Sequence, residues 1–224
     1  DLLVDITHIP ELTQVDENDE GITFGACVTH ADIEDLRVPD VTRGALPAVA
    51  RGIAYRAVRN RGTVGGSLVH ADPAADWVSA LAAAGATVTI AGPSGTRRVP
   101  VEELMVSVFE TSLEPGELLV SVHVPRFSAQ ARWGHYKITR KTGEFAHAMA
   151  ILLNDPARNV CRLVIGAIEA KPLVIADASA YFDESGQLNT DKIETLFAES
   201  GLKDPVANKI HMTALTRAVQ RAQL

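Results

Sequence analysis

The 224-residue sequence predicts an α+β protein built as two small domains, one after the other. In the first half of the chain, short strand-like and helix-like segments follow one another without the regular alternation of a parallel α/β fold. Apolar periodicity then lapses among small and polar residues at 126–132, which predicts domains at 1–126 and 127–224. Beyond this boundary, strand-like segments joined by turn sequences precede helical segments, which is typical of an antiparallel sheet covered by helices.

The first domain is predicted to begin with a strand. Residues 2–6 form a short apolar run that ends in a polar turn, so we expect a buried strand there, followed by a second strand at 22–26. Thr29 and Asp32 have the spacing of a capping box, with Asp in the usual Glu position, which predicts the start of a helix. Apolar residues recur at helical spacing over 41–53, which predicts a packed helix.

The first domain continues with a helix, a hairpin and a strand. Residues 74–84 are rich in alanine, and Trp77 and Leu81 lie four positions apart, which predicts one buried helical face. Trp77 could stack on a ligand, but a core or interface position is the commoner role of a lone tryptophan. The remaining segments are a hairpin with strands at 86–91 and 97–99, a short helix at 101–108 and a strand at 118–124.

The second domain is predicted as a three-stranded antiparallel sheet with helices. Turn sequences around Gly143 and Pro156 separate the predicted strands. The strands are expected at 133–140, 145–153 and 161–168, and the helices at 174–182, 191–199 and 211–224.

Residues 59–76 (RNRGTVGGSLVHADPAAD) are the most informative segment, and they predict a long shaped loop that enters the next helix. Gly65 and Gly66 lack side-chain carbons, so we expect positive backbone angles there and close approach by another molecule. Successive backbone NH groups in such a turn form a concave surface that attracts anions, above all phosphates. Thr63 and Ser67 add hydroxyl groups that can complete a phosphate contact.

Two aspartates close this segment. Asp76 is placed where a carboxylate could accept hydrogen bonds from the diol of a ribose. This set of groups suits a dinucleotide better than a lone phosphate. The alternative is a tight turn whose glycines only satisfy geometry and whose Asp72 or Asp76 caps the following helix.

Composition limits the classes of function. A hydrophobic content of 46% with 22% charged residues is ordinary for a globular protein, and no apolar run approaches the length of a membrane span. The net charge of -7 and the aromatic content of 5% argue against nucleic-acid binding. Cys27 and Cys161 are far apart, so the chain offers no ligand set for a metal or iron-sulfur cluster. Reduced thiols and the lack of an export signal predict a cytoplasmic protein.

The string at 59–76 resembles the second flavin-phosphate loop in the FAD-binding subunits of molybdenum hydroxylases. These are the medium subunits of the carbon monoxide dehydrogenase type and the flavin domain of xanthine dehydrogenase. Their pattern is Arg-Asn, two variable residues, Thr-Ile-Gly-Gly-Asn-Leu or Thr-Ile-Gly-Gly-Ser-Leu, then Ala-Asp-Pro-Ala-x-Asp. Ser67 stands where members of the xanthine dehydrogenase type carry Asn, so one cofactor contact is expected to differ. The resemblance extends over the whole chain, with matches at 3–12, 113–119 and 136–145.

The resemblance implies an FAD-binding domain of the vanillyl-alcohol oxidase and xanthine dehydrogenase type, followed by the C-terminal domain of the flavoprotein subunit. It implies no catalytic residue and no metal ligand in this chain. An apolar residue covers the flavin ring at the position of Leu119, a lysine reaches the flavin at Lys137, and some members place a tyrosine over the ring where this chain has Phe145. The cofactor-binding residues implied are Ile53, Thr63, Val64, Gly65, Gly66, Ser67, Asp72, Asp76, Leu119, Lys137 and Phe145.

The function implied is electron transfer within a complex. A large subunit would hold molybdopterin and oxidise the substrate, a small subunit with two 2Fe-2S clusters would relay electrons, and this subunit would pass them from FAD to an acceptor. The family also has an earlier Ala-Gly-Gly loop in a small subdomain of roughly fifty residues. We expect Asp1 to begin after that subdomain, so that the chain holds FAD weakly or not at all.

Two other functions fit parts of the pattern. A flavin-free scaffold that docks onto the molybdopterin and iron-sulfur subunits needs only one of the two phosphate loops. A stand-alone flavin oxidase of the vanillyl-alcohol oxidase type would need a substrate-binding domain, for which residues 126–224 are too short and too helical. A nicotinamide-binding Rossmann domain is disfavoured because Gly-x-Gly-x-x-Gly is absent from the sequence.

Overall fold

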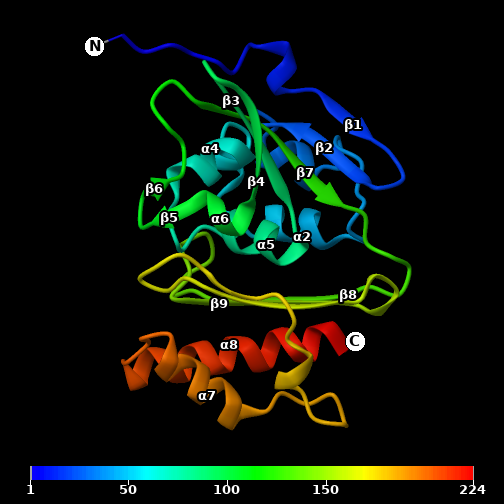
Figure 1. Ribbon diagram of the computed structural model, residues 1–224, viewed down its shortest axis with the longest axis vertical. Helices are drawn as coiled ribbons and strands as arrows, with labels where there is room; N and C mark the ends of the chain where they lie inside the picture. The colour runs from blue at the N-terminus through cyan, green and yellow to red at the C-terminus, as the bar shows by residue number, and fades with distance from the viewer. Residues whose placement is uncertain (1, 224) are drawn as a thin grey trace.

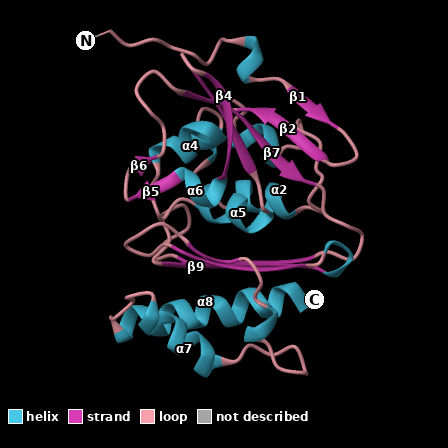
Figure 2. Ribbon diagram, viewed as in Figure 1, coloured by secondary structure: helices cyan, strands magenta, loops and turns pink. Residues whose placement is uncertain are grey.

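Two antiparallel sheets with helices between and below them make up the computed structural model, which describes residues 2–223 (Figure 1 and Figure 2). The first sheet has five strands in the order β1-β2-β7-β3-β4, and the second has four in the order β11-β10-β9-β8. A short hairpin of β5 and β6 lies beside the first sheet. The α+β class predicted from the sequence is confirmed.

The first sheet pairs strands that lie far apart in the sequence. β7 is its central strand and pairs with both β2 and β3, so Phe24 lies opposite Val122, and Val88 lies opposite Val122 from the other side. Turn residues between β3 and β4 make the predicted hairpin, which is confirmed. The strands are β1 (Val15–Glu17), β2 (Gly21–Gly25), β3 (Thr87–Gly92), β4 (Gly95–Pro100), β5 (Met105–Ser107), β6 (Glu110–Thr111) and β7 (Leu118–Pro125).

Helix α5 (Asp76–Ala84) lies at the centre of the molecule, between the two sheets. All nine of its residues are buried, including Trp77 at 0% exposure. Its many alanines keep the helix narrow, so both sheets can approach it closely. The other elements of this half are the 3-10 turn η1 (Pro10–Leu12) and the helices α1 (His30–Glu34), α2 (Ala45–Arg51), α3 (Arg56–Arg59), α4 (Val64–His70) and α6 (Val101–Leu104).

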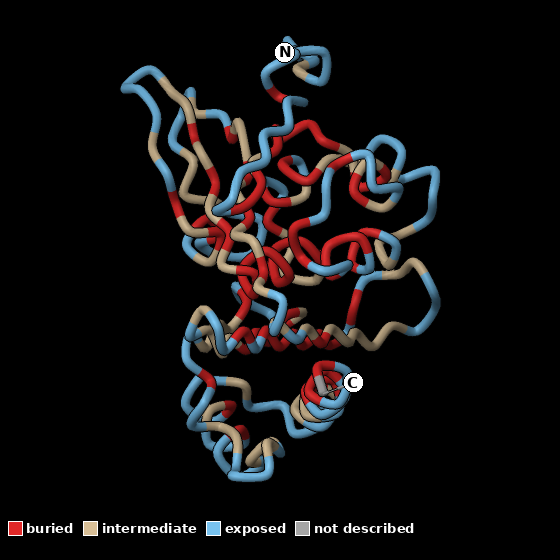
Figure 3. Tube along the Cα trace, turned by 90° about the vertical axis from the view of Figure 1, so that its right-hand side faces the viewer, coloured by how far each residue is buried: buried red, intermediate tan, exposed pale blue. Residues whose placement is uncertain are grey.

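The second sheet is covered on both faces, and its strand β9 is buried along most of its length, which gives the red part of the sheet in Figure 3. Successive residues of a strand point to opposite faces. In β9, Met149 and Ile151 pack into the core that contains α5, while Ala150 and Leu152 pack against α8. The elements are β8 (Arg132–Ile138), β9 (Ala148–Asp155), β10 (Val160–Gly166), β11 (Leu173–Ile175), η2 (Pro156–Arg158), η3 (Ser179–Tyr181), α7 (Thr190–Glu199) and α8 (Pro205–Gln223).

Because one core runs from α5 into β9, the hydrophobic packing is continuous across the proposed boundary at 126/127. Residues 126–131 connect β7 of the first sheet to β8 of the second. The division into domains at 1–126 and 127–224 stays a prediction.

Several predicted elements are confirmed and others need correction. The Thr29–Asp32 capping box is present. The two C-terminal helices form, but α8 begins at Pro205 rather than at the predicted 211, and Leu224 lies outside the described residues. The predicted helix at 174–182 is wrong, because residues 173–175 form an edge strand, β11, and a 3-10 turn follows. The sheet therefore has four strands rather than three. The helix predicted at 101–108 ends at Leu104 and continues as β5.

The buried strand predicted at 2–6 is also wrong. Leu2, Leu3 and Val4 are 88%, 95% and 72% exposed, and the segment runs outside the first sheet (Figure 1). An apolar run forms a strand only where a neighbouring strand offers hydrogen-bonding groups. β1 pairs with β2, and residues 2–6 pair with neither.

Candidate functional site

The glycine-rich segment is a helix rather than a loop. Thr63 is the N-cap of α4, and its Oγ1 accepts a hydrogen bond from the NH of Gly66 at 3.0 Å. A threonine followed by small residues favours this start, since the hydroxyl satisfies an NH group that the helix leaves open. The long loop predicted at 59–76 is therefore corrected to a turn, helix α4 and a second turn.

Neither Gly65 nor Gly66 has a positive backbone φ, so that expectation is wrong. Close packing explains the glycines instead. A Cβ on Gly65 would lie 2.5 Å from the Cβ of Ala26, and one on Gly66 would lie 2.8 Å from Oγ1 of Thr63. Gly65 thus lets the first turn of α4 touch the chain after β2.

The first NH groups of α4 already have acceptors inside the protein. Val64 donates to the carbonyl of Val28 at 3.0 Å, and Gly65 donates to the carbonyl of Ala26 at 2.9 Å. Ser67 donates within the helix to the carbonyl of Thr63. The first NH groups of α4 are therefore all hydrogen-bonded within the protein, and they fix the start of the helix to the chain after β2.

A cavity of about 180 Å³ lies beside this helix, and four of the sequence-predicted residues line it. Ile53 follows α2, Ser67 belongs to α4, Asp76 begins α5, and Phe145 lies in the turn between β8 and β9. Segments far apart in the sequence therefore meet at one place. The full lining is His30, Ile53, Ala54, Val58, Ser67, His70, Ala75, Asp76, Gly143, Glu144 and Phe145.

Arg59 fixes one wall of this cavity. Its guanidinium donates to the carbonyl of Ile53 at 2.9 Å and forms an ion pair with Glu34 at 2.7 Å, with both side chains only 11% exposed. The Arg59 hydrogen bonds lower the pKa of the Glu34 carboxyl. The ion pair ties α3 to α1 and holds the chain after α2 against the pocket.

Asp76 and Lys137 form an ion pair across the two halves of the molecule, with Nζ 2.9 Å from the carboxylate. Nζ also donates to the carbonyl of Gly52 at 2.8 Å. Burial raises the pKa of Asp76, against the opposing effect of the Lys137 ammonium. Both carboxylate oxygens contact the ammonium, since Nζ lies 2.9 Å from Oδ1 and 2.9 Å from Oδ2.

His135, two residues before Lys137 on β8, also lies close to Asp76. Its Nε2 is 3.8 Å from Oδ1 of Asp76, which is too long for a hydrogen bond. Burial, with the nearby Lys137 and Arg221, lowers the pKa of His135 to about 3. The imidazole is therefore neutral, and Lys137 is the cation that balances Asp76.

His30 is a pocket residue that the sequence did not reveal. It is 5% exposed, and its Nδ1 accepts a hydrogen bond from Nε1 of Trp77 at 2.9 Å. Burial and the charge of Arg59 lower the pKa of His30 to about 4. The sequence places His30 directly after the N-cap Thr29, but no pattern in the neighbouring residues predicts its hydrogen bond to a tryptophan 47 positions away.

The remaining predicted residues lie outside the cavity lining. Val64 is fully buried, and Leu119 in β7 is 2% exposed opposite Ile90, so both are part of the core. Asp72 accepts a hydrogen bond from the NH of Ala74 at 2.8 Å and shapes the turn before α5.

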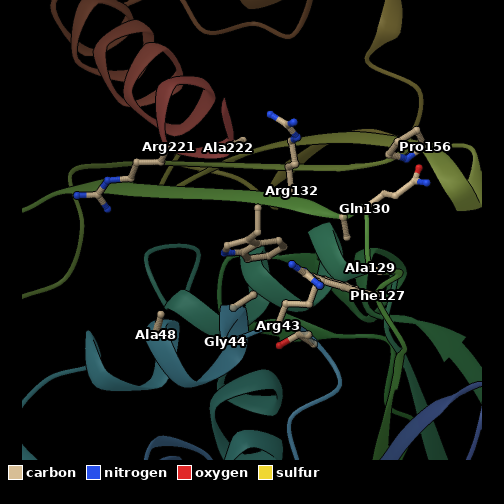
Figure 4. A pocket seen from close by; sticks show the side chains of 14 residues that line it. Arg43, Gly44, Ala48, Phe127, Ala129, Gln130, Arg132, Pro156, Arg221 and Ala222 are labelled. Atoms are coloured by element: carbon tan, nitrogen blue, oxygen red, sulfur yellow. The ribbon is translucent and has the colours of Figure 1, made fainter. Parts of the chain in front are cut away.

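A larger cavity of about 860 Å³ lies elsewhere, between α2, the 126–131 connection and the end of α8 (Figure 4). Arg43, Arg132 and Arg221 reach it, and none of the sequence-predicted cofactor residues lines it. Arg221 donates to the carbonyl of His135 at 2.8 Å and stacks over the ring of Tyr136. Size alone does not identify a binding site, and the smaller cavity has the converging buried polar groups.

The sequence matches the family model described as the FAD binding domain in molybdopterin dehydrogenase over residues 1–127. The chain therefore belongs to this family of FAD-binding oxidoreductase domains. Among the residues that the structure describes, no helix has both the length and the apolarity needed to cross a membrane.

Relatives and solved structures agree with this assignment. The chain is 39% identical over 145 residues to 6-hydroxypseudooxynicotine dehydrogenase complex subunit alpha of Paenarthrobacter nicotinovorans, covering 65% of this chain and 49% of that protein. It is 30% identical over 205 residues to the nicotine 6-hydroxylase medium subunit of the same organism, covering 90% and 71%. A structure of carbon monoxide dehydrogenase from Hydrogenophaga pseudoflava, which lacks the Mo-pyranopterin moiety of its cofactor, superposes with TM-score 0.84 at 27% identity, covering 98% and 80%.

Coverage differs between these relatives. The chain spans about half the length of the first protein and about seven tenths of the second. Both are subunits of larger enzymes by name, one an alpha subunit and the other a medium subunit.

Proposed function

We propose that this chain is the FAD-binding electron-transfer subunit of a molybdopterin-dependent hydroxylase or dehydrogenase. The observation that carries the proposal is the 180 Å³ cavity, in which Ile53, Ser67, Asp76 and Phe145 meet from four separate segments of the family pattern. Such convergence of apolar side chains with a few polar groups is typical of a cofactor site.

The residues present fit part of an FAD molecule. The buried carboxylate of Asp76 lines the cavity with its charge balanced by Lys137 at 2.9 Å, and its remaining lone pairs can accept hydrogen bonds from the hydroxyl groups of a ligand. Phe145 is 63% exposed at the rim and is free to cover a flat ring. The cavity is smaller than a whole-cofactor site, so it accounts for one portion of FAD.

Each implied contact then has a role. Thr63 to Ser67 would border the phosphates, with Ser67 the member that reaches the cavity, and Asp76 would bind the ribose. Ile53 and Phe145 would cover the rings, and Lys137 would act through its ion pair with Asp76, because its ammonium is already bound there. When bound, FAD supplies the redox chemistry, and this chain positions it and sets its electrostatic surroundings.

We also propose the partners and the place in the electron path. A molybdopterin-binding large subunit would oxidise the substrate, and a small subunit with 2Fe-2S clusters would pass electrons to this chain. The matches to a medium subunit and to an alpha subunit of multi-subunit enzymes support a hetero-oligomer. A cytoplasmic location remains a prediction from the free thiols of Cys27 and Cys161.

Titration of FAD into the purified chain, followed by quenching of flavin fluorescence, tests the proposal. Weak but saturable one-to-one binding that Asp76→Asn weakens further is the expected result. Binding that is unaffected by changes at Asp76 and Ser67 would move the cofactor site away from this cavity.

A flavin-free scaffold is the second candidate function. It is favoured by one observation, which is that Val64, Gly65 and Gly66 already direct their NH groups to acceptors within the protein. The same titration decides between the two. If the chain binds its partner subunits in pull-down but shows no FAD binding, the scaffold replaces the flavoprotein.

A further inference from the structure

The hydrogen bond between Trp77 and His30 fixes the proton on the imidazole. An indole Nε1 can only donate a hydrogen bond. Nδ1 of His30, 2.9 Å away, must therefore be the acceptor, and in the neutral ring the proton is on Nε2. Trp77 is fully buried in α5, so this arrangement is held by the core.

The imidazole is held on a second side by Gly62. The NH of His30 donates to the carbonyl of Gly62 at 3.0 Å, and a Cβ on Gly62 would lie 2.8 Å from Nε2. The ring thus has little freedom to turn. Among residues 2–223, Nε2 finds no acceptor, and unlike Oδ1 of Asp76 it is not fully enclosed.

His30 lines the same cavity as Ile53, Val58, Ala75 and Phe145. These four side chains are apolar and favour contact with a flat ring, while Ser67, His70, Asp76 and Glu144 contribute polar groups to the same lining. A fixed N–H among apolar walls is suited to a carbonyl oxygen or an imine nitrogen at the edge of a heteroaromatic ring.

We propose that His30 is a cofactor-binding residue whose Nε2–H donates a hydrogen bond to the ring edge of the flavin. The inference rests on the function proposed above and adds a cofactor-binding residue outside the segment 59–76 that resembles the family. The lowered pKa of His30 keeps the ring neutral at pH 7, so the donor adds no charge to a site that already contains the Asp76–Lys137 pair. His30 and Lys137 thus act in different ways, one by a directed hydrogen bond and the other by charge.

Two substitutions of similar size separate binding from structure. His30→Asn places an amide near Nδ1, where it can still accept from Trp77, but it does not reach the position of Nε2. His30→Gln places an amide nitrogen near Nε2. We expect His30→Asn to weaken FAD binding about three- to tenfold, the effect of one neutral hydrogen bond, and His30→Gln to stay near wild type.

ADP provides the control ligand, because it has the phosphates and ribose of FAD but no flavin ring. Its affinity, measured by displacement of FAD, should be the same in the wild-type chain and in both variants. His123→Asn is the control substitution, since His123 bonds Thr23 in the first sheet and lies outside the cavity.

Each other outcome overturns the inference. Equal FAD affinity in His30→Asn and wild type would remove His30 from the site. A loss of affinity for FAD and ADP together, or a greater loss in His30→Gln than in His30→Asn, would assign His30 a structural role beneath Trp77. Absence of FAD binding by the wild-type chain would overturn the proposed function itself, which is a separate result.

Discussion

The start of α4 and the cavity beside it share Ser67 but use their polar groups in opposite ways. At the start of α4, the NH groups of Val64, Gly65 and Gly66 are bonded within the protein. In the cavity, the carboxylate of Asp76 is paired with Lys137 and still has lone pairs that a ligand could use. The glycine motif therefore stabilises the frame, and under the proposed function the side chains that line the cavity would bind the ligand.

Breaking the Asp76–Lys137 pair should have the largest effect on stability. Lys137→Met leaves a carboxylate that is 8% exposed without its cation, so we expect a loss of about 3–5 kcal/mol in the free energy of unfolding, measured with urea at pH 7. The double variant Asp76→Asn with Lys137→Met removes both charges and should recover part of that loss. A change below about 1 kcal/mol in Lys137→Met would show that the pair contributes little.

Gly65→Ala should have the next largest effect. The added Cβ would meet the Cβ of Ala26 at 2.5 Å and its carbonyl oxygen at 2.7 Å, so the backbone must shift, at a cost of about 2–3 kcal/mol. Gly66→Ala is the matched control. Its Cβ meets only Oγ1 of Thr63, and the helix propensity of alanine offsets the contact, so we expect a change within about 1 kcal/mol. Equal costs at both positions would contradict the packing explanation.

The sequence predicted features that depend on neighbours along the chain. The Thr29–Asp32 capping box, the β3–β4 hairpin and the buried helix after Pro73 each follow from local spacing. The string at 59–76 also predicted a cofactor site, and two of its residues, Ser67 and Asp76, line the smaller cavity.

The sequence could not predict pairs that depend on the tertiary fold. Trp77 meets His30 across 47 positions, and Lys137 meets Asp76 across 61. It also mistook residues 2–6 for a strand, since whether an apolar run pairs depends on which sheet edge lies beside it. The sequence also failed to predict the backbone conformation of Gly65, because a glycine is equally suited to a close contact and to a positive φ.

Acid should destabilise the protein through its buried histidines. Between about pH 6.5 and pH 4, the unfolded chain binds a proton at His30 that the folded chain excludes, so the free energy of unfolding falls as pH falls through this window. From the lowered pKa of about 4, His30 alone accounts for about 2 kcal/mol between pH 7 and pH 5, and His135 adds to it. The raised pKa of Asp76 acts in the opposite direction.

Urea unfolding at pH 7 and pH 5 measures this dependence, and His30→Gln is the variant that isolates one histidine. Its stability should fall less between the two pH values than that of the wild-type chain. Identical slopes for the two proteins would mean that His30 is not held neutral by its surroundings.

Thr63→Val should have the smallest effect on stability. It tests whether the start of α4 has only a structural role or also binds the cofactor. Valine keeps the β-branched shape, which suits the extended backbone at this N-cap, but it removes the hydroxyl that accepts from Gly66. We expect a loss of about 1 kcal/mol in stability, with Thr63→Ser close to wild type. FAD affinity gives the second readout: if the hydroxyl serves only the helix, affinity is unchanged in Thr63→Val at temperatures where the variant is folded. A fall in affinity that serine restores would instead show that Thr63 contacts the cofactor, and the start of α4 would then be a binding surface as well as a structural joint.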